Sequence, residues 1–356
     1  MPEPLSAVDA VSPALDHTRR LLFAPFRFAK WARLAVVTFL SGEMVGGGGG
    51  GGTGFQFPAP PPRGGGSEEF HFLQSSPAER WLTEFLPWIL LGVVAVFALA
   101  LLFIYINSVF RFILFDAVLN DRWRLREGWS RWANRGASFF LWQLAYMILF
   151  MAVLGAVIGL PILLALQAGW FKQAGQHVGA LVLGGLVLLL LVFVTFVGGL
   201  VIAVLARDFV VPIMALDDVG AIEGWRRALP LLRGAKLSFA GYIGMKIVLA
   251  IAAGILFGIL GTIVVLVIVV PLAILGAVLA AAGFFSGLAW TPATIAAAVV
   301  FGLAALALLL CVVAFISVPS AVFFQSYTLH FYAGRYPPLA AALETAQSAA
   351  APAAAG

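Results

Sequence analysis

Charged residues are scarce in this 356-residue chain, and their scarcity excludes a soluble protein. Only 10% of the residues are Asp, Glu, Lys or Arg, whereas 62% are hydrophobic. Soluble domains contain about 25% charged and about 45–50% apolar residues. The single cysteine, Cys311, lies inside an apolar run, so it provides no disulfide framework and we interpret it as a core residue.

Clusters of residues that carry chemistry are also missing. The four histidines, His17, His71, His177 and His330, stand singly in different segments. This isolation provides neither the local spacing of a metal site nor a Ser/His/Asp arrangement. We therefore predict no catalytic residue, no metal site and no cofactor, and we do not expect an enzyme. The net charge of +5 does not indicate nucleic acid, because the basic residues gather at the ends of apolar runs and beside tryptophans.

Long apolar runs are what the sequence does contain. Five of them reach or exceed the roughly 20 residues that a helix needs to cross a bilayer: residues 85–110, 138–168, 178–206, 238–283 and 292–324. Continuous runs differ from the short alternating segments of a membrane β-barrel, and backbone groups in lipid must be satisfied internally. The sequence therefore predicts an all-α protein, a polytopic transmembrane helical bundle of about six membrane segments that occupies residues 85–338.

The first segment, residues 1–45, predicts an amphipathic N-terminal helix followed by a short membrane insertion. In "HTRRLLFAPFRFAKWARL" the five basic residues fall within one sector of about 140° at 100° per residue, and Pro25 predicts a kink. The stretch 34–45 is marginal for a complete crossing. A signal peptide is the competing interpretation, but Glu43 interrupts the apolar stretch and no small-residue cleavage site follows it.

Two low-complexity segments and one long run complete the division of the chain. Residues 46–84 are rich in glycine and proline and predict a flexible extracytoplasmic loop, and the Ala-rich residues 339–356 predict a disordered tail. The run 238–283 contains Pro271. We favour one bent crossing with a re-entrant or interfacial piece, while two crossings would place the C-terminus outside.

The distribution of basic residues predicts the orientation in the membrane. Residues 1–33, 111–137 and 206–237 carry five, six and five Lys or Arg, whereas 46–84 and 169–179 carry two and one. Short loops rich in Lys and Arg face the cytoplasm. We therefore expect a multi-pass protein with a cytoplasmic N-terminus.

A charged phrase occurs twice, as "EGWSR" at 127–131 and "EGWRR" at 223–227. The match extends upstream to give R-x9-D-x5-E-G-W-x-R in both copies. This spacing predicts an internal repeat, about 85–131 and 181–227, whose copies form two similar cytoplasmic elbows. In each elbow we expect the Asp to cap a surface helix, the glycine to allow a close approach, and Glu and Arg to pair at i and i+4.

The elbows and one buried-looking lysine supply the candidate binding residues. Tryptophan suits the headgroup layer and arginine reaches anionic phosphates, although a plain packed elbow is the alternative interpretation. Lys246 lies within an apolar run, so it is either functional, a snorkelling side chain, or paired with Asp208 or Asp116. The candidate lipid- or partner-binding residues are Arg111, Trp129, Arg131, Arg207, Trp225, Arg227 and Lys246.

Three stretches carry a resemblance to a known group: "RRLLFAPFRFAKWARL", "RDFVVPIMALDD" and "AVFFQSYTLHFY". The chain resembles, over about residues 14–338, a large uncharacterised group of bacterial membrane proteins of about six helices. That group is similar to the membrane domain that accompanies some glycerophosphoryl diester phosphodiesterases, whose catalytic barrel has no counterpart here. The tail "AGRYPPL" departs from the acidic ending of the group. The resemblance implies the bacterial cytoplasmic membrane and no established activity.

Together these features predict a non-catalytic integral membrane protein. We expect a scaffold or accessory subunit whose partners are the phospholipid bilayer with its anionic lipid headgroups, or another membrane protein. A carrier for a small amphipathic solute is the alternative, for which Lys246, Pro161 and Pro271 are the indications.

Overall fold

The computed structural model describes residues 4–24, 26–43, 77–171, 174–285 and 291–350. Within these ranges the chain is helical and contains no strand. Five helical stretches are long and apolar enough to cross a membrane: Phe85–Asn120, Leu125–Gln167, Val178–Leu216, Lys236–Val278 and Ala293–Ala333. The predicted all-α membrane fold is thereby confirmed.

The described elements fall into three successive groups along the chain. The first half contains α1 (Val11–Phe23), α2 (Phe28–Leu40), α3 (Pro77–Asn120), α4 (Leu125–Gln167) and the short 3₁₀ turn η2 (Ala174–Gln176). Next come α5 (Val178–Leu205), the π-helical turn η3 (Ala206–Val210), α6 (Val211–Leu216) and α7 (Ala221–Gly234). The last part contains α8 (Lys236–Val264), the π-helical turn η4 (Val265–Val269), α9 (Val270–Phe285), α10 (Pro292–Ala333) and α11 (Pro337–Ala350).

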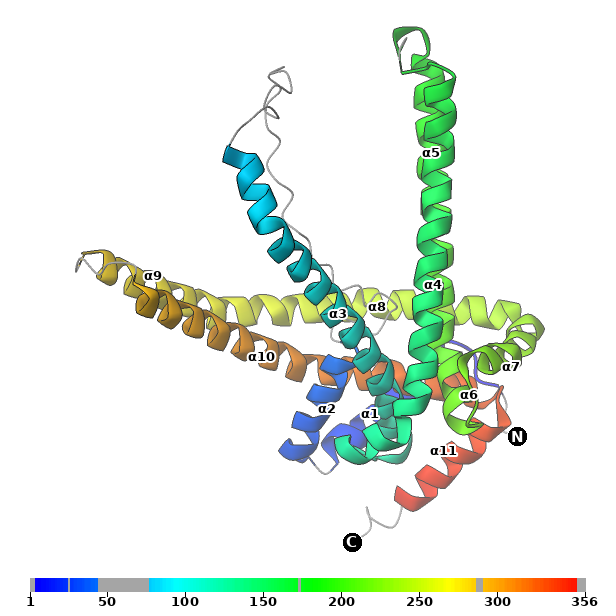
Figure 1. Cartoon of the computed structure of the whole chain (residues 1–356). Coiled ribbons are helices and arrows are strands. Elements are labelled where there is room, and N and C mark those ends of the chain that lie inside the picture. Colours follow the sequence, from blue (N-terminus) through cyan, green and yellow to red (C-terminus); the bar gives the residue numbers. More distant parts are fainter. Residues whose placement is uncertain (1–3, 25, 44–76, 172–173, 286–290, 351–356) are drawn as a thin grey trace.

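The helices form a packed base from which three arms diverge (Figure 1). The base contains α1, α2, α6, α7 and α11, together with the ends of α3 and α10 and the beginnings of α4 and α8. The arms are α3 alone, the α4–α5 pair, and α8 and α9 with α10. Aromatic side chains such as Phe112, Phe209 and Tyr327 are fully buried in the base, whereas Leu189 in an arm is 70% exposed. Apolar surface of this extent along the arms fits a bilayer as the surrounding solvent.

The N-terminal segment differs from the prediction. It forms two helices, α1 and α2, in place of one kinked helix, and both pack against α10 in the base. Leu34 and Val37 of α2 are buried, because the apolar face of this helix packs against other helices of the protein. With 13 residues α2 is about 20 Å long at 1.5 Å per residue, which is too short to cross a bilayer. The described residues therefore provide five candidate spans and not six.

The two low-complexity segments are also partly helical. Residues 44–76 of the predicted glycine-rich loop lie outside the described residues, but α3 begins at Pro77, so 77–84 are not loop. The prediction of a disordered tail was wrong for α11, in which Leu339 and Leu343 are 0% and 7% exposed. These leucines are four residues apart, so one narrow face of an otherwise Ala-rich helix can pack on the base.

The long run 238–283 lies in one unbroken helical path through α8, η4 and α9. The π-helical turn η4 ends two residues before Pro271, whose ring and missing N–H disturb the regular ladder. The expected re-entrant piece is absent from this described stretch, so that part of the prediction was wrong. Helix α10 then runs back beside α8, which brings the C-terminal helix to the same base as both elbows (Figure 1).

Candidate functional site

The two repeated phrases form elbows with the same helix boundaries. Helix α3 ends at Asn120 and α4 begins at Leu125, while α6 ends at Leu216 and α7 begins at Ala221. Both pairs of boundaries are separated by the 96-residue offset of the phrases. The expected Asp caps are wrong, because the N-cap residues are Arg124 and Gly220 and neither makes a side-chain capping bond.

The phrase glycines do lie where another helix approaches closely, as the sequence predicts. A Cβ atom on Gly128 would lie 3.1 Å from Ile113 Cγ1, on the preceding helix α3. A Cβ atom on Gly224 would lie 2.9 Å from Val210 Cγ1, in the π-helical turn before α6. Each surface helix therefore folds back tightly onto the segment that precedes it.

The predicted pairing of Glu and Arg holds in one elbow and fails in the other. In the second elbow Arg227 Nε donates to Glu223 Oε1 at 3.0 Å, as expected. In the first elbow Glu127 pairs with Arg124 at 2.8 Å, and Arg131 lies 3.8 Å from Asp116. The difference has a local cause, because the place of Arg124 is taken by glycine in the second copy.

Both phrase tryptophans pack against other aromatic rings. The ring centroid of Trp129 lies 5.9 Å from that of Tyr105, and that of Trp225 lies 5.6 Å from that of Trp142 on α4. The indole N–H of Trp225 is buried without a hydrogen-bond partner. The headgroup layer expected around Trp225 therefore does not reach its N–H group, and the ring links the second elbow to α4.

The two elbows are joined to each other through α4. Arg135 on α4 forms an ion pair with Asp218 at 2.6 Å, and Ser138 Oγ accepts a hydrogen bond from the backbone N–H of Ala221 at 3.1 Å. The bond from Arg135 holds the pKa of the Asp218 carboxyl below its usual range. The elbows thus lie side by side at one end of the molecule, which agrees with the sequence argument that both copies share one face.

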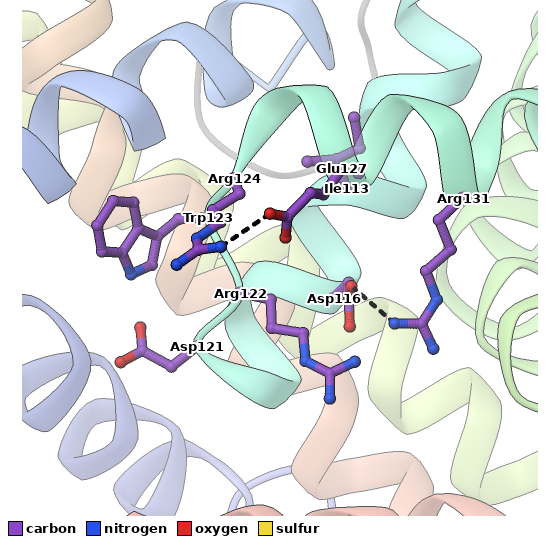
Figure 2. Close-up of a pocket in the computed structure, with 9 residues that line it drawn as sticks. Ile113, Asp116, Asp121, Arg122, Trp123, Arg124, Glu127 and Arg131 are labelled. Atoms are coloured by element: carbon purple, nitrogen blue, oxygen red, sulfur yellow. Dashed lines mark hydrogen bonds and ion pairs between the residues drawn. The ribbon is translucent and has the colours of Figure 1, made fainter.

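The first elbow surrounds a pocket of about 470 Å³ (Figure 2). Its lining is strongly charged and consists of Ile113, Asp116, Asp121, Arg122, Trp123, Arg124, Glu127, Gly128 and Arg131. Dashed lines in Figure 2 join Arg124 to Glu127 and Arg131 to Asp116, and none reaches Arg122. We name this feature the elbow pocket.

The lining of the elbow pocket has three arginines and three carboxylates, and Lys30, just outside the lining, adds one positive charge in excess. Each of its three carboxylates has a cationic partner, since Asp121 is paired with Lys30 of α2 at 2.6 Å and the other two meet Arg124 and Arg131. Arg122 is exposed and has no ion pair among the described residues. A free guanidinium at the mouth of a pocket can bind a phosphate or carboxylate with two parallel hydrogen bonds.

Of the predicted site residues, Arg111 is buried and Arg207 is largely covered by protein. Arg111 is 5% exposed, and its Nη2 donates to Asn107 Oδ1 at 3.2 Å. Arg207 Nη1 lies 3.7 Å from Glu43 Oε1, where α2 has just ended. The sequence indicates this arrangement only through one carboxylate that interrupts an apolar stretch, and Glu43 is not among the predicted site residues.

Lys246 forms an internal ion pair. Its Nζ lies 2.6 Å from Asp208 Oδ2, and both side chains are at most 10% exposed. The hydroxyl of Tyr242 donates to the same oxygen at 2.9 Å. Of the two predicted partners Asp208 is the correct one, and the snorkelling alternative is excluded because the ammonium group points to a carboxylate within the base.

Comparison with known families gives one match. A family model described as a family of unknown function, DUF7544, matches residues 5–342. No curated protein and no solved structure matches the chain. The expectation of an uncharacterised family is thus confirmed, whereas no link to the glycerophosphoryl diester phosphodiesterases is shown.

Proposed function

Since the chain belongs to DUF7544, a family of unknown function, we propose its role from the elbow pocket: a non-catalytic protein that engages anionic lipid headgroups. In this proposal it is an integral protein of the bacterial cytoplasmic membrane, with the N-terminus and the base on the cytoplasmic side. It acts there as a scaffold or accessory subunit, and the bound lipid or a membrane partner is held at the base.

The charge of the elbow pocket carries the proposal. The pocket lies between the end of the candidate span Phe85–Asn120 and the start of Leu125–Gln167, and we expect this position at the level of lipid phosphates. Arg122, the cation of the pocket without an ion pair among the described residues, is followed in the sequence by Trp123. The Cζ atom of Arg33 lies over the Trp123 ring, 4.6 Å from its centroid. The pocket volume of about 470 Å³ lies within the usual range of ligand pockets, about 300–1,000 Å³.

The internal repeat belongs to the same proposal. Matching helix boundaries and matching close-packed glycines support a duplication of an elbow unit. The second copy then acts as a structural support, because its Arg227 is engaged by Asp217 and Glu223. The lipid-binding role of the protein would then rest on the first copy alone.

We also propose, from the sequence resemblance, that the chain is similar to the membrane domain of the glycerophosphoryl diester phosphodiesterases.

The test compares lipids retained by the purified protein. Arg122→Gln and Arg131→Gln together remove two of the pocket's cations, and Asp116 keeps its hydrogen bonds from Asn120 and Trp132 when Arg131 is replaced. We expect native mass spectrometry in mild detergent to show at least a threefold loss of bound phosphatidylglycerol, with unchanged helical content by circular dichroism. Arg226→Gln is the matched control, because Arg226 is 79% exposed and lies outside the pocket. Equal retention in the double variant and the control would refute the proposal.

A carrier is the second candidate, and one observation favours it. The π-helical turn η3 places Asp208 next to Lys246, where the candidate spans Val178–Leu216, Lys236–Val278 and Ala293–Ala333 meet. Such turns often occur at functional sites, and carriers place charged groups among broken helices. Solute flux in proteoliposomes that is lost in Asp208→Asn would favour this function, and flux independent of the protein would exclude it.

A further inference from the structure

A second charged site lies deeper than the elbow pocket and shares no residue with it. We name it the inner charge cluster; it consists of Glu43, Arg111, Arg207, Asp208 and Lys246. Arg111 lies nine residues before the end of α3, and Lys246 lies ten residues after the start of α8. At 1.5 Å per residue these positions are about 15 Å from those helix ends, within the buried part of the base and inside the candidate spans.

One half of the inner charge cluster is fully satisfied. Lys246 and Asp208 form a neutral pair at 2.6 Å. Tyr242 adds a hydrogen bond to Asp208, and its hydroxyl also lies 2.7 Å from Thr328 Oγ1. Buried charges persist when they are paired and hydrogen-bonded in this way. This half therefore requires no further ligand.

The other half is unbalanced. Arg111 and Arg207 together carry two positive charges, and Glu43 supplies the one carboxylate that remains among the described residues of the cluster. The contact between Arg207 and Glu43 is 3.7 Å, which is too long for a hydrogen bond. The Glu43 carboxylate thus feels the charge of both guanidinium groups but makes no pair of hydrogen bonds with Arg207.

An unpartnered buried N–H points to the same place. Nε of Arg111 has no hydrogen-bond partner, although the residue is only 5% exposed. Its Nη2 reaches neutral oxygens alone, namely Asn107 Oδ1 at 3.2 Å and the Ser41 carbonyl at 3.4 Å. Buried donors are almost always satisfied, and a guanidinium fork fits an oxyanion best. The missing acceptor of the Arg111 Nε–H group therefore needs a structural explanation.

We propose that Arg111 and Arg207 form a binding site for a phosphate-class oxyanion, and that Glu43 holds the place of its oxygens in this structure. A phosphate group carries up to two negative charges and three acceptor oxygens, so it balances two arginines better than one carboxylate does. The side chains of Arg207 and Glu43 each retain 16% exposure, which leaves a path for exchange. Binding moves Glu43 away, so the end of α2 responds to the ligand.

The ligand is either the headgroup of an anionic lipid or a soluble phosphate compound, because both present the same oxygens. A lipid would enter between the diverging arms α3 and α4, and a soluble compound would enter along Glu43. The proposal stands apart from the function assigned to the elbow pocket, since the two sites have no residue in common.

The test is a titration of the full-length protein in detergent with inorganic phosphate at constant ionic strength, read as the shift in melting temperature. Glu43→Gln removes the competing carboxylate, so we expect about tenfold tighter phosphate binding. Arg207→Gln should abolish binding. Arg122→Gln, in the elbow pocket, should leave phosphate binding unchanged even where it reduces retained lipid, which separates the two sites.

Glu43→Gln is the decisive variant, because tighter binding cannot result from poor folding. Wild-type binding that Arg207→Gln leaves intact, or a Glu43→Gln variant that binds phosphate no more tightly than wild type, would overturn the proposal. Short-chain phosphatidic acid and phosphatidylcholine then identify the source. At least tenfold tighter binding of phosphatidic acid than of inorganic phosphate indicates a lipid ligand, and equal or weaker binding indicates a soluble one.

Discussion

The pair formed by Lys246 and Asp208 provides the clearest prediction about stability. Their side chains are 7% and 10% exposed and their charged atoms are 2.6 Å apart. Removal of one member of such a buried pair leaves an uncompensated charge and costs about 3–5 kcal/mol. In Lys246→Met the carboxylate of Asp208 keeps its hydrogen bond from Tyr242, so we expect the lower end, about 3 kcal/mol.

Removal of both charges should restore most of this loss. In Lys246→Met with Asp208→Asn neither member of the pair carries a charge, and the amide oxygen can still accept from Tyr242. We expect the double variant to lie within about 1 kcal/mol of wild type. The assay is a denaturant titration in mixed micelles followed by circular dichroism, with Lys236→Met as the control, because Lys236 is exposed at the start of α8. A loss below about 1 kcal/mol in Lys246→Met, or a double variant as unstable as the two single variants added together, would refute the reasoning.

Three further predictions concern packing, orientation and pH. Gly136→Ala should destabilise the protein by about 1–3 kcal/mol, because its Cβ would lie 2.8 Å from the Val109 Cα on α3, whereas Gly155→Ala, with nothing within 4 Å, should not; equal melting temperatures would contradict this. In a chain with Cys311→Ala, a cysteine at Ser130 in the first elbow should resist a membrane-impermeant thiol reagent in intact cells and one at Gln176, between α4 and α5, should react; the reverse pattern would invert the orientation. Burial lowers the pKa of His17 below its ordinary 6.5, despite the hydrogen bond to the Val118 carbonyl, so the unfolded chain binds the proton more readily and stability should fall as the pH drops below 6.5. His17→Gln should weaken that dependence, and an unchanged pH profile of the melting temperature would count against it.

Hydropathy predicted the membrane-crossing stretches well, because the composition of a span is set by the bilayer and not by its neighbours. The apolar run 178–206 corresponds to α5, and 292–324 falls inside α10. Helix ends were harder to place. Helix α4 begins at Leu125, well before the apolar run at 138, since the polar elbow continues the same helical path.

Contacts between distant segments explain what the sequence could not reveal. In the sequence Glu43 is only an interruption of an apolar stretch, because its neighbour Arg207 is more than 160 residues away along the chain. Trp225 resembled a headgroup anchor because the stacking partner Trp142 comes from another helix. The phrase glycines were easier to interpret, because glycine inside a helix is costly unless a neighbour needs the space. The type of a residue thus predicts its local geometry, whereas the identity of its distant partner is visible only in the folded structure.

The location of bound lipid tests the central claim most directly. The protein is reconstituted with a photoactivatable phosphatidylglycerol whose reactive group sits in the headgroup, is irradiated, and is digested for peptide mass spectrometry. We predict cross-links concentrated within residues 113–131, the stretch that contains the lining of the elbow pocket, and their loss in Arg122→Gln with Arg131→Gln but not in Arg226→Gln. Cross-links spread evenly over the arms, or matched by a phosphatidylcholine probe, would contradict the account of an anionic-lipid site at the base.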